Sequence, residues 1–306
     1  MLNNIIKTDC INIVLIILSL IFAIIFPFWL FLFSYAVFGP LHYLTEISWL
    51  HKKQYFLGKN EYQILVVVSI IMAIFFCFSG NINANSHFVF IVFALAAIMI
   101  LIQNTWLRLI SFLIALMIAF FWQNFVFYKI IFAIFLTTII HVWFFTALFI
   151  LSGAIKNKLF SGYLSLIIFL FCSVSFFLFL PEKIFGASDL KSIEIINNSG
   201  FDILNNLISQ IFTFSSVKVQ GFIAFSYTYH YLNWFSKVKI INWHQVPKKL
   251  LILLILLWIG SVGLYIYDYH LGLISLLFLS IIHVFLEFPL NFKVILTILK
   301  IPHNIN

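Results

Sequence analysis

The sequence predicts an all-α, polytopic integral membrane protein: a helical bundle of about nine transmembrane helices. Of its 306 residues, 64% are hydrophobic and only 8% are charged, whereas a soluble domain carries about 25% charged residues. So few charges cannot cover a water-soluble surface, and we therefore expect lipid to cover most of the molecule. Because lipid satisfies no open backbone groups, each long apolar run is predicted to be a helix.

About nine apolar runs are long enough to cross a membrane, which takes about 20 residues. They are 12–38, 62–79, 87–103, 105–122, 126–152, 163–181, 213–236, 250–267 and 271–292. The longest connection, roughly 182–212, carries acidic residues and ends in apolar residues at helical spacing. We expect an extramembrane or interfacial segment there, within a single transmembrane domain that spans 1–306.

The basic residues predict how the chain is oriented. With nine spans, twelve of the 17 Lys and Arg residues fall on one side of the membrane and five on the other. The richer side is the cytoplasmic one by the positive-inside rule, which places the N-terminus outside. The formal charge of +8 is thus an orientation signal of a multi-pass protein, and we predict the bacterial inner (plasma) membrane. No basic stripe indicates a nucleic-acid partner.

Six of the nine histidines are candidates for function, because ionisable residues in membrane spans are costly and usually functional. These six are His42, His51, His141, His230, His244 and His283. On the predicted topology they favour the cytoplasmic half of the membrane, although they come from segments far apart in the sequence. Random placement would not prefer one leaflet so clearly.

Two of these histidines are followed four residues later by a glutamate, as His42 with Glu46 and His283 with Glu287. Residues at i and i+4 share a helix face, and an imidazole with a carboxylate suits iron, manganese or zinc. Glu287 lies in an apolar helix, so it must be protonated, paired or bound to a cation. A single membrane histidine can instead be an interhelical hydrogen-bond partner, but the set with two such pairs favours a metal site.

The densest cluster of aromatic and polar residues is the segment 227–234. Aromatic residues near a membrane interface usually form an anchoring belt, which explains its tryptophan but not His230 or Asn233. We predict that His230 is a metal ligand. Tyr227, Tyr231 and Asn233 are predicted to contact the substrate.

Three short stretches resemble the bacterial β-carotene dioxygenase family of the Brp/Blh type. They are His42 with Glu46 near the end of an early helix, Trp243-His244-Gln245-Val246-Pro247, and His283 near the C-terminus. Tyr43 stands where that family has a glycine, and no His-Phe-Gly motif follows. The resemblance implies a multi-helix membrane protein whose histidines hold iron, and one of the three stretches contains the candidate His244.

The leading hypothesis is a membrane metalloenzyme: a non-haem iron oxygenase acting on a lipid-soluble substrate, carotenoid-like or acyl, from the surrounding membrane lipid. The predicted metal ligands are His42, His141, His230, His283 and, less directly, His244, with Glu46 and Glu287 as catalytic or ligand carboxylates.

Three alternatives stay open. The first is a zinc-dependent intramembrane lipid hydrolase, in which one of the two glutamates is the general base. The second is a proton-coupled transporter without a metal, since intramembrane His and Glu also serve proton transfer. The third is a haem protein with two axial histidines. The oligomeric state is not indicated.

Overall fold

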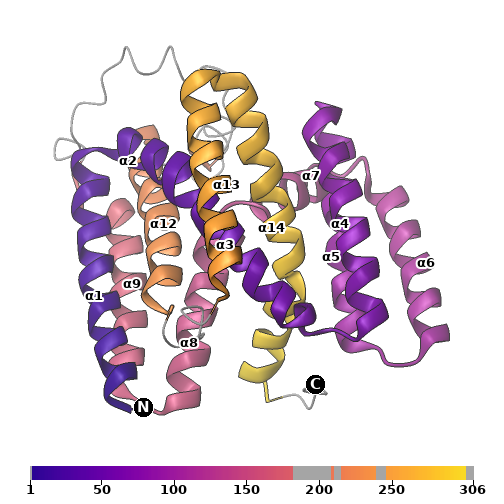
Figure 1. Cartoon of the computed structure of the whole chain (residues 1–306), viewed down its shortest axis with the longest axis horizontal. Coiled ribbons are helices and arrows are strands. Elements are labelled where there is room, and N and C mark those ends of the chain that lie inside the picture. Colours follow the sequence, from indigo (N-terminus) through magenta and orange to yellow (C-terminus); the bar gives the residue numbers. More distant parts are fainter. Residues whose placement is uncertain (1, 182–207, 210–214, 239–245, 301–306) are drawn as a thin grey trace. The chain divides into compact units, whose positions relative to one another are not determined.

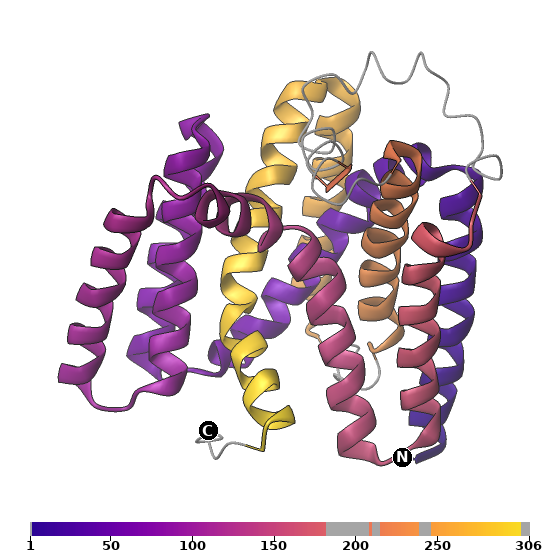
Figure 2. The ribbon, with the colours of Figure 1, turned by 180° about the vertical axis from the view of Figure 1, so that it is seen from behind.

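The computed structural model describes residues 2–181, 208–209, 215–238 and 246–300, and within them the chain is almost entirely helical, with no strand. Nine of the described helices are long and apolar enough to cross a membrane. Figure 1 and Figure 2 show them as long rods joined mostly by short connections. The chain is therefore an all-α, multi-pass integral membrane protein, as predicted.

The elements follow one another along the chain with few residues between them. They are α1 Leu2–Ile25, α2 Pro27–Phe33, the π-helical η1 Ser34–Phe38, α3 Gly39–Lys52, the 3₁₀ turn η2 Gln54–Phe56, α4 Lys59–Ser79, α5 Ile82–Leu101, α6 Thr105–Trp122, α7 Val126–Lys129, the π-helical η3 Ile130–Phe135 and η4 Ile140–Phe145, α8 Thr146–Asn157, α9 Phe160–Leu178, α12 Ser216–Ser236, α13 Lys248–Tyr267 and α14 Tyr269–Ile298. The predicted interfacial segment near 182–212 lies outside the described residues, apart from 208 and 209.

The prediction of a single helix over the first span, 12–38, is wrong. The structure has two apolar helical spans there, Asn4–Ile25 and Pro27–Lys52. Pro27 has no backbone N–H and disfavours helical geometry in the residue before it, so Phe26 takes φ −134° and ψ 56° and the first helix ends. Hydropathy shows no break at this position, because Phe26 and Phe28 on either side of Pro27 keep the run apolar.

Two crossings in place of one reverse the predicted placement of the N-terminus. With α12 counted as a crossing in addition to the nine apolar spans, Lys7 falls on the same side of the membrane as Lys52 and Lys53, and the other assignments are unchanged. The basic residues divide thirteen against four, which strengthens the positive-inside asymmetry.

The described chain forms two compact units that are interleaved in sequence. Unit 1 comprises Met1–Phe38 and Val142–Gln245, and unit 2 comprises Gly39–His141 and Val246–Asn306. Neither unit is one continuous segment, and the prediction of a single transmembrane domain stays a prediction.

Unit 1 is organised around α12, which packs against α1, α2, η1 and α9. Every residue of α12 from Val219 to Tyr231 is buried. The helix forms where 213–236 was predicted, but its polar residues keep it out of the nine most apolar helices. Hydrogen bonds tie it to its neighbours: the Ser34 and Thr228 hydroxyls lie 2.7 Å apart, as expected for polar contacts between membrane helices.

Unit 2 is organised around α14, which packs against α3, α4, α5 and α13. Residues 283–289 of α14 are all buried. Phe93 of α5 lies between Phe288 and Phe292, with ring centroids 5.2 and 4.9 Å away, so one side of α14 is occupied by apolar packing. α13 and α14 run side by side as an antiparallel pair (Figures 1 and 2).

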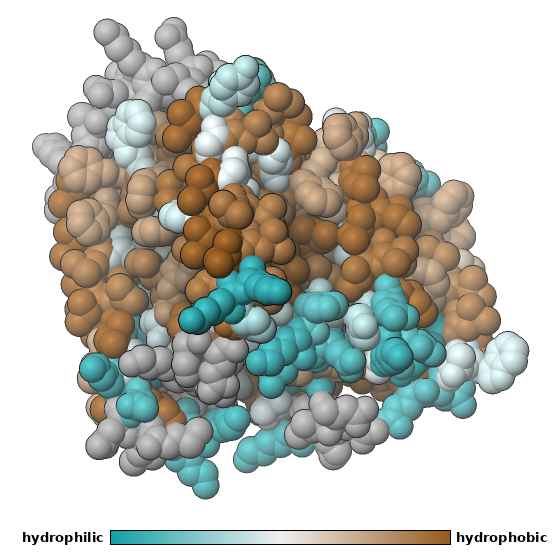
Figure 3. Space-filling model, in the orientation of Figure 1, coloured by the Kyte–Doolittle hydropathy of each residue, from teal (hydrophilic) through white to brown (hydrophobic). Residues whose placement is uncertain are grey.

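The outward faces of the helices are apolar, as a lipid-covered protein requires. Figure 3 shows a face dominated by hydrophobic side chains. On α6, large residues such as Trp106, Phe120 and Phe121 are more than half exposed. Exposed aromatic and aliphatic side chains on this scale are accounted for by lipid contact.

We predict that Gly272→Ala destabilises unit 2, because the backbone of α14 at Gly272 lies against Tyr265 of α13. A Cβ atom there would lie 2.9 Å from both the backbone nitrogen and Cβ of Tyr265, and a backbone atom cannot swing aside. The expected loss is about 1–3 kcal/mol of unfolding free energy, measured as a lower Tm in detergent.

The matched control is Gly263→Ala on α13, where an added Cβ meets nothing within 4 Å. Its Tm should stay the same or rise slightly, because alanine favours a helix by about 1 kcal/mol over glycine. Equal Tm values for the two variants would contradict the close approach.

Candidate metal centre

Five of the predicted site residues meet inside unit 2. They are His42 and Glu46 on α3, His141 on η4, and His283 and Glu287 on α14. Each is at most 3% exposed, so the cluster is out of contact with solvent and lipid. We call these five residues the His/Glu cluster.

Each segment that carries the cluster departs from a regular α-helix near its ligand-type residue. The π-helical η1 ends four residues before His42, and His141 itself lies in the π-helical η4. Pro289 lies inside α14, two residues after Glu287, where it removes a helical hydrogen bond to the carbonyl of Phe285. π-turns and internal prolines re-aim side chains and are frequent at functional sites.

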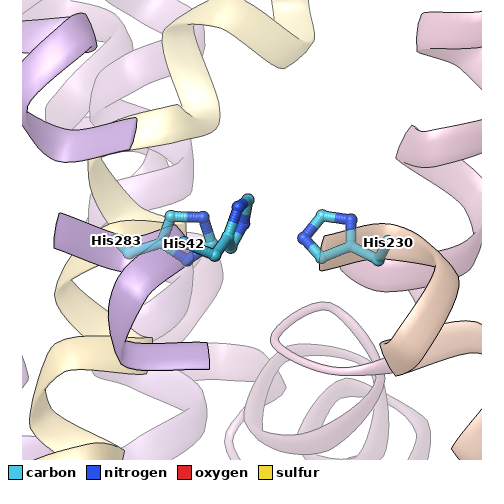
Figure 4. Close-up of side chains that lie close together, drawn as sticks. All are labelled: His42, His230 and His283. Carbon is cyan, nitrogen blue, oxygen red and sulfur yellow. The ribbon is translucent and has the colours of Figure 1, made fainter. Parts of the chain in front are cut away.

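Glu46 lies between two imidazoles. Its Oε2 is 3.2 Å from Nε2 of His42, one turn earlier on the same helix, and 3.2 Å from Nε2 of His283 on α14. The His42 and His283 rings lie side by side, with centroids 4.8 Å apart and planes at 72° (Figure 4). The predicted i, i+4 pair on α3 is confirmed as a contact, and its carboxylate also links α3 to α14.

Glu287 repeats this arrangement with a different pair of imidazoles. Its Oε2 is 3.6 Å from Nε2 of His283 and 3.4 Å from Nδ1 of His141. Nε2 of His283 therefore faces both carboxylates. Ligand atoms of His141, His283 and Glu287 all lie within 4.8 Å of one another, which makes these three residues a candidate metal-binding set.

The separations between these atoms fit ligands of a common cation. Nitrogen and oxygen ligands at about 2.0–2.2 Å from a divalent metal stand roughly 3–3.6 Å apart at tetrahedral or octahedral angles. The four contacts of the His/Glu cluster measure 3.2–3.6 Å. The donor set and its spacing therefore suit a metal ion such as iron or zinc.

The charge of the cluster also requires a cation or protons. Two carboxylates, Glu46 and Glu287, lie 3% and 1% exposed in an apolar surrounding. A buried carboxylate without a compensating charge is strongly destabilising. One divalent cation with three neutral imidazoles would balance both negative charges, and protonation of two imidazoles would balance them as well.

His230, a further predicted ligand, lies on α12 in unit 1 and is 5% exposed. Its Nδ1 is 2.8 Å from Oγ1 of Thr146, the first residue of α8, and this hydrogen bond orients the ring. Figure 4 shows the His230 ring projecting from its helix. Its role as a ligand stays a prediction, and His244 lies outside the described residues.

The predicted substrate-binding residues Tyr227, Tyr231 and Asn233 are buried on the same helix. The ring of Tyr227 contacts Phe31 and Tyr35 at centroid distances of 5.2 and 6.4 Å, forming an aromatic layer inside unit 1. Aromatic packing of this kind suits a membrane helix bundle as well as a binding site. The substrate role of these residues therefore stays a prediction.

The histidine pattern alone distinguished the site residues from the others incompletely: it included His51 and missed Asn291. His51 is on the same helix as His42 but exposed at its end, where its ring contacts Tyr55 and Tyr62. Burial, with Tyr62 nearby, raises the pKa of Tyr55 to about 12.

Asn291 was not predicted as a site residue, although the sequence contained a signal for it: Asn291 follows His283 and Glu287 at the same four-residue spacing.

The chain was compared with protein families, curated proteins and solved structures. No protein family, curated protein or solved structure matches the chain. The resemblance to β-carotene dioxygenases in three short stretches stays an expectation. The function of this multi-pass membrane protein is therefore inferred from the geometry of its His/Glu cluster.

Proposed function

We propose that this chain is a membrane-embedded metalloenzyme, a non-haem iron oxygenase that acts on a lipid-soluble substrate. The observation that carries the proposal is the His/Glu cluster: three imidazoles and two carboxylates from three helical segments, buried and linked by contacts of 3.2–3.6 Å, of which His141, His283 and Glu287 have ligand atoms within 4.8 Å of one another. A purely structural role would not require two carboxylates to converge on one imidazole nitrogen in an apolar bundle.

The donor set favours iron among the metals that it can hold. Imidazole nitrogens combined with one or two carboxylate oxygens, with coordination positions left open, are typical of non-haem iron oxygenases. When bound, iron would supply the redox chemistry that activates O₂. Zinc accepts the same ligands but would support hydrolysis instead.

The chain's own residues would orient the metal and exclude water. Glu46 holds the imidazoles of His42 and His283 in a fixed relation through its Oε2. Glu287 offers Oε2 as a second negative oxygen that can also take up or release a proton. Burial of all five residues excludes bulk water, which strengthens these interactions and favours a substrate that enters from the lipid phase.

We predict that the protein purified in detergent binds about one divalent metal ion per chain. His283→Ala and Glu46→Gln should lose most of the bound metal, because the first removes the Nε2 that faces both carboxylates and the second removes the negative charge of the carboxylate that faces two imidazoles. Plasma mass spectrometry after gel filtration measures the stoichiometry.

The matched control is His51→Ala, which removes an exposed histidine from the same helix as His42 and should retain the metal. A wild-type protein that stays metal-poor after loading with Fe(II) or Zn(II) would overturn the proposal. His230→Ala, measured in parallel, tests separately the predicted ligand role of that residue.

We further predict that the Fe(II)-loaded protein consumes O₂ when supplied with a total apolar lipid extract of its host membrane. The zinc-loaded protein and Fe(II)-treated His283→Ala should show only background uptake in an oxygen electrode, because the reaction needs redox-active metal held in the cluster. Product release by the zinc form without O₂ uptake would favour a hydrolase. Proton-coupled flux in proteoliposomes without bound metal would favour a transporter.

A further inference from the structure

Asn291 is a buried amide one helical turn beyond Glu287 on α14. Asn291 is 1% exposed, and neither its Nδ2 nor its Oδ1 has a hydrogen-bond partner among the residues that the structure describes. Most of the surrounding positions on α14 are apolar. A leucine of similar size would fit an apolar environment without leaving polar atoms unpaired.

An unpaired buried amide is destabilising, which makes its presence informative. Leaving a buried donor or acceptor unsatisfied costs roughly 1–3 kcal/mol. Buried polar side chains in native proteins are almost always paired, and an exception calls for a functional explanation. A group on α14 that pairs with the amide in the functional protein is therefore expected.

Glu287 offers the complementary group. Its Oε2 lies 3.4 Å from His141 and 3.6 Å from His283, and neither of its carboxylate oxygens has a hydrogen-bond partner in the described part of the chain. Residues four apart on a helix have Cβ atoms about 5–6 Å apart and lie on the same face. The amide Nδ2 is a donor and the carboxylate Oε1 an acceptor, and side-chain hydrogen bonds between such groups form at this spacing on helices.

We propose that Asn291 is a positioning residue of the metal centre, whose Nδ2 donates a hydrogen bond to Oε1 of Glu287 and so leaves Oε2 for the cation. This inference rests on the proposed function. It assigns Asn291 an action through Glu287, without contact to the metal or the substrate. Hydrogen bonds to a ligand carboxylate fix its orientation, and their loss typically weakens metal binding about 10–100-fold.

The test is a titration of the full-length detergent-solubilised protein with Co(II), followed by its visible absorbance and by Tm. Asn291→Leu should bind Co(II) about 10–100-fold more weakly and should show a smaller Co(II)-induced rise in Tm. A purely structural amide would leave both the Co(II) affinity and the Co(II)-induced rise in Tm unchanged.

Two further variants separate the explanations. Asn291→Asp keeps the size but loses the donor, so it should also weaken Co(II) binding; tighter binding would mean that this position contacts the metal directly and would overturn the positioning role. Ser69→Ala on α4 is the matched control, since Ser69 is fully buried with an Oγ that has no hydrogen-bond partner among described residues. It should leave Co(II) affinity unchanged.

The outcomes for the two proposals differ. A wild-type protein that binds no Co(II) would overturn the metalloenzyme itself. Wild-type binding that is matched by Asn291→Leu in affinity and absorbance would overturn only the role of Asn291.

Discussion

Neutralising two carboxylates inside an apolar helical bundle is the constraint on which the arrangement of unit 2 depends. Glu46 and Glu287 approach the same nitrogen, Nε2 of His283, from two different helices. In a low-dielectric surrounding this geometry is stable only with a compensating positive charge, as a cation or as protons. The close packing of α3 against α14 therefore brings together the groups that require such a charge.

The same helices show a conflict between regular backbone geometry and side-chain placement. The π-helical segments η1 and η4 and the internal Pro289 each interrupt the regular hydrogen-bond ladder close to a cluster residue. In a membrane, lost backbone hydrogen bonds are costly and must be satisfied within the protein. Their occurrence next to the His/Glu cluster, in helices that are otherwise long and regular, is consistent with selection for the placement of these side chains.

Local sequence pattern was sufficient for most of the helices and failed for two runs: 12–38, and 126–152, where a shorter helix, Val126–Phe135, precedes the span Ile140–Asn157. The run 105–122 coincides with α6, because Asn104 caps its start with hydrogen bonds to the backbone N–H groups of Trp106 and Leu107. The run 12–38 contained its break at Pro27, among phenylalanines that keep the hydropathy high. Hydropathy measures the transfer of side chains to lipid and takes no account of the backbone N–H that proline lacks.

The sequence by itself determined the membrane class, the helical fold and the two His-x-x-x-Glu pairs, because composition and i, i+4 spacing are local properties. Only the tertiary structure decided that His42, Glu46, His141, His283 and Glu287 meet, and that His51 on the same helix as His42 does not join them. Spacing shows which residues share a helix face. Which faces meet depends on packing between helices far apart in the sequence, and no local pattern records it.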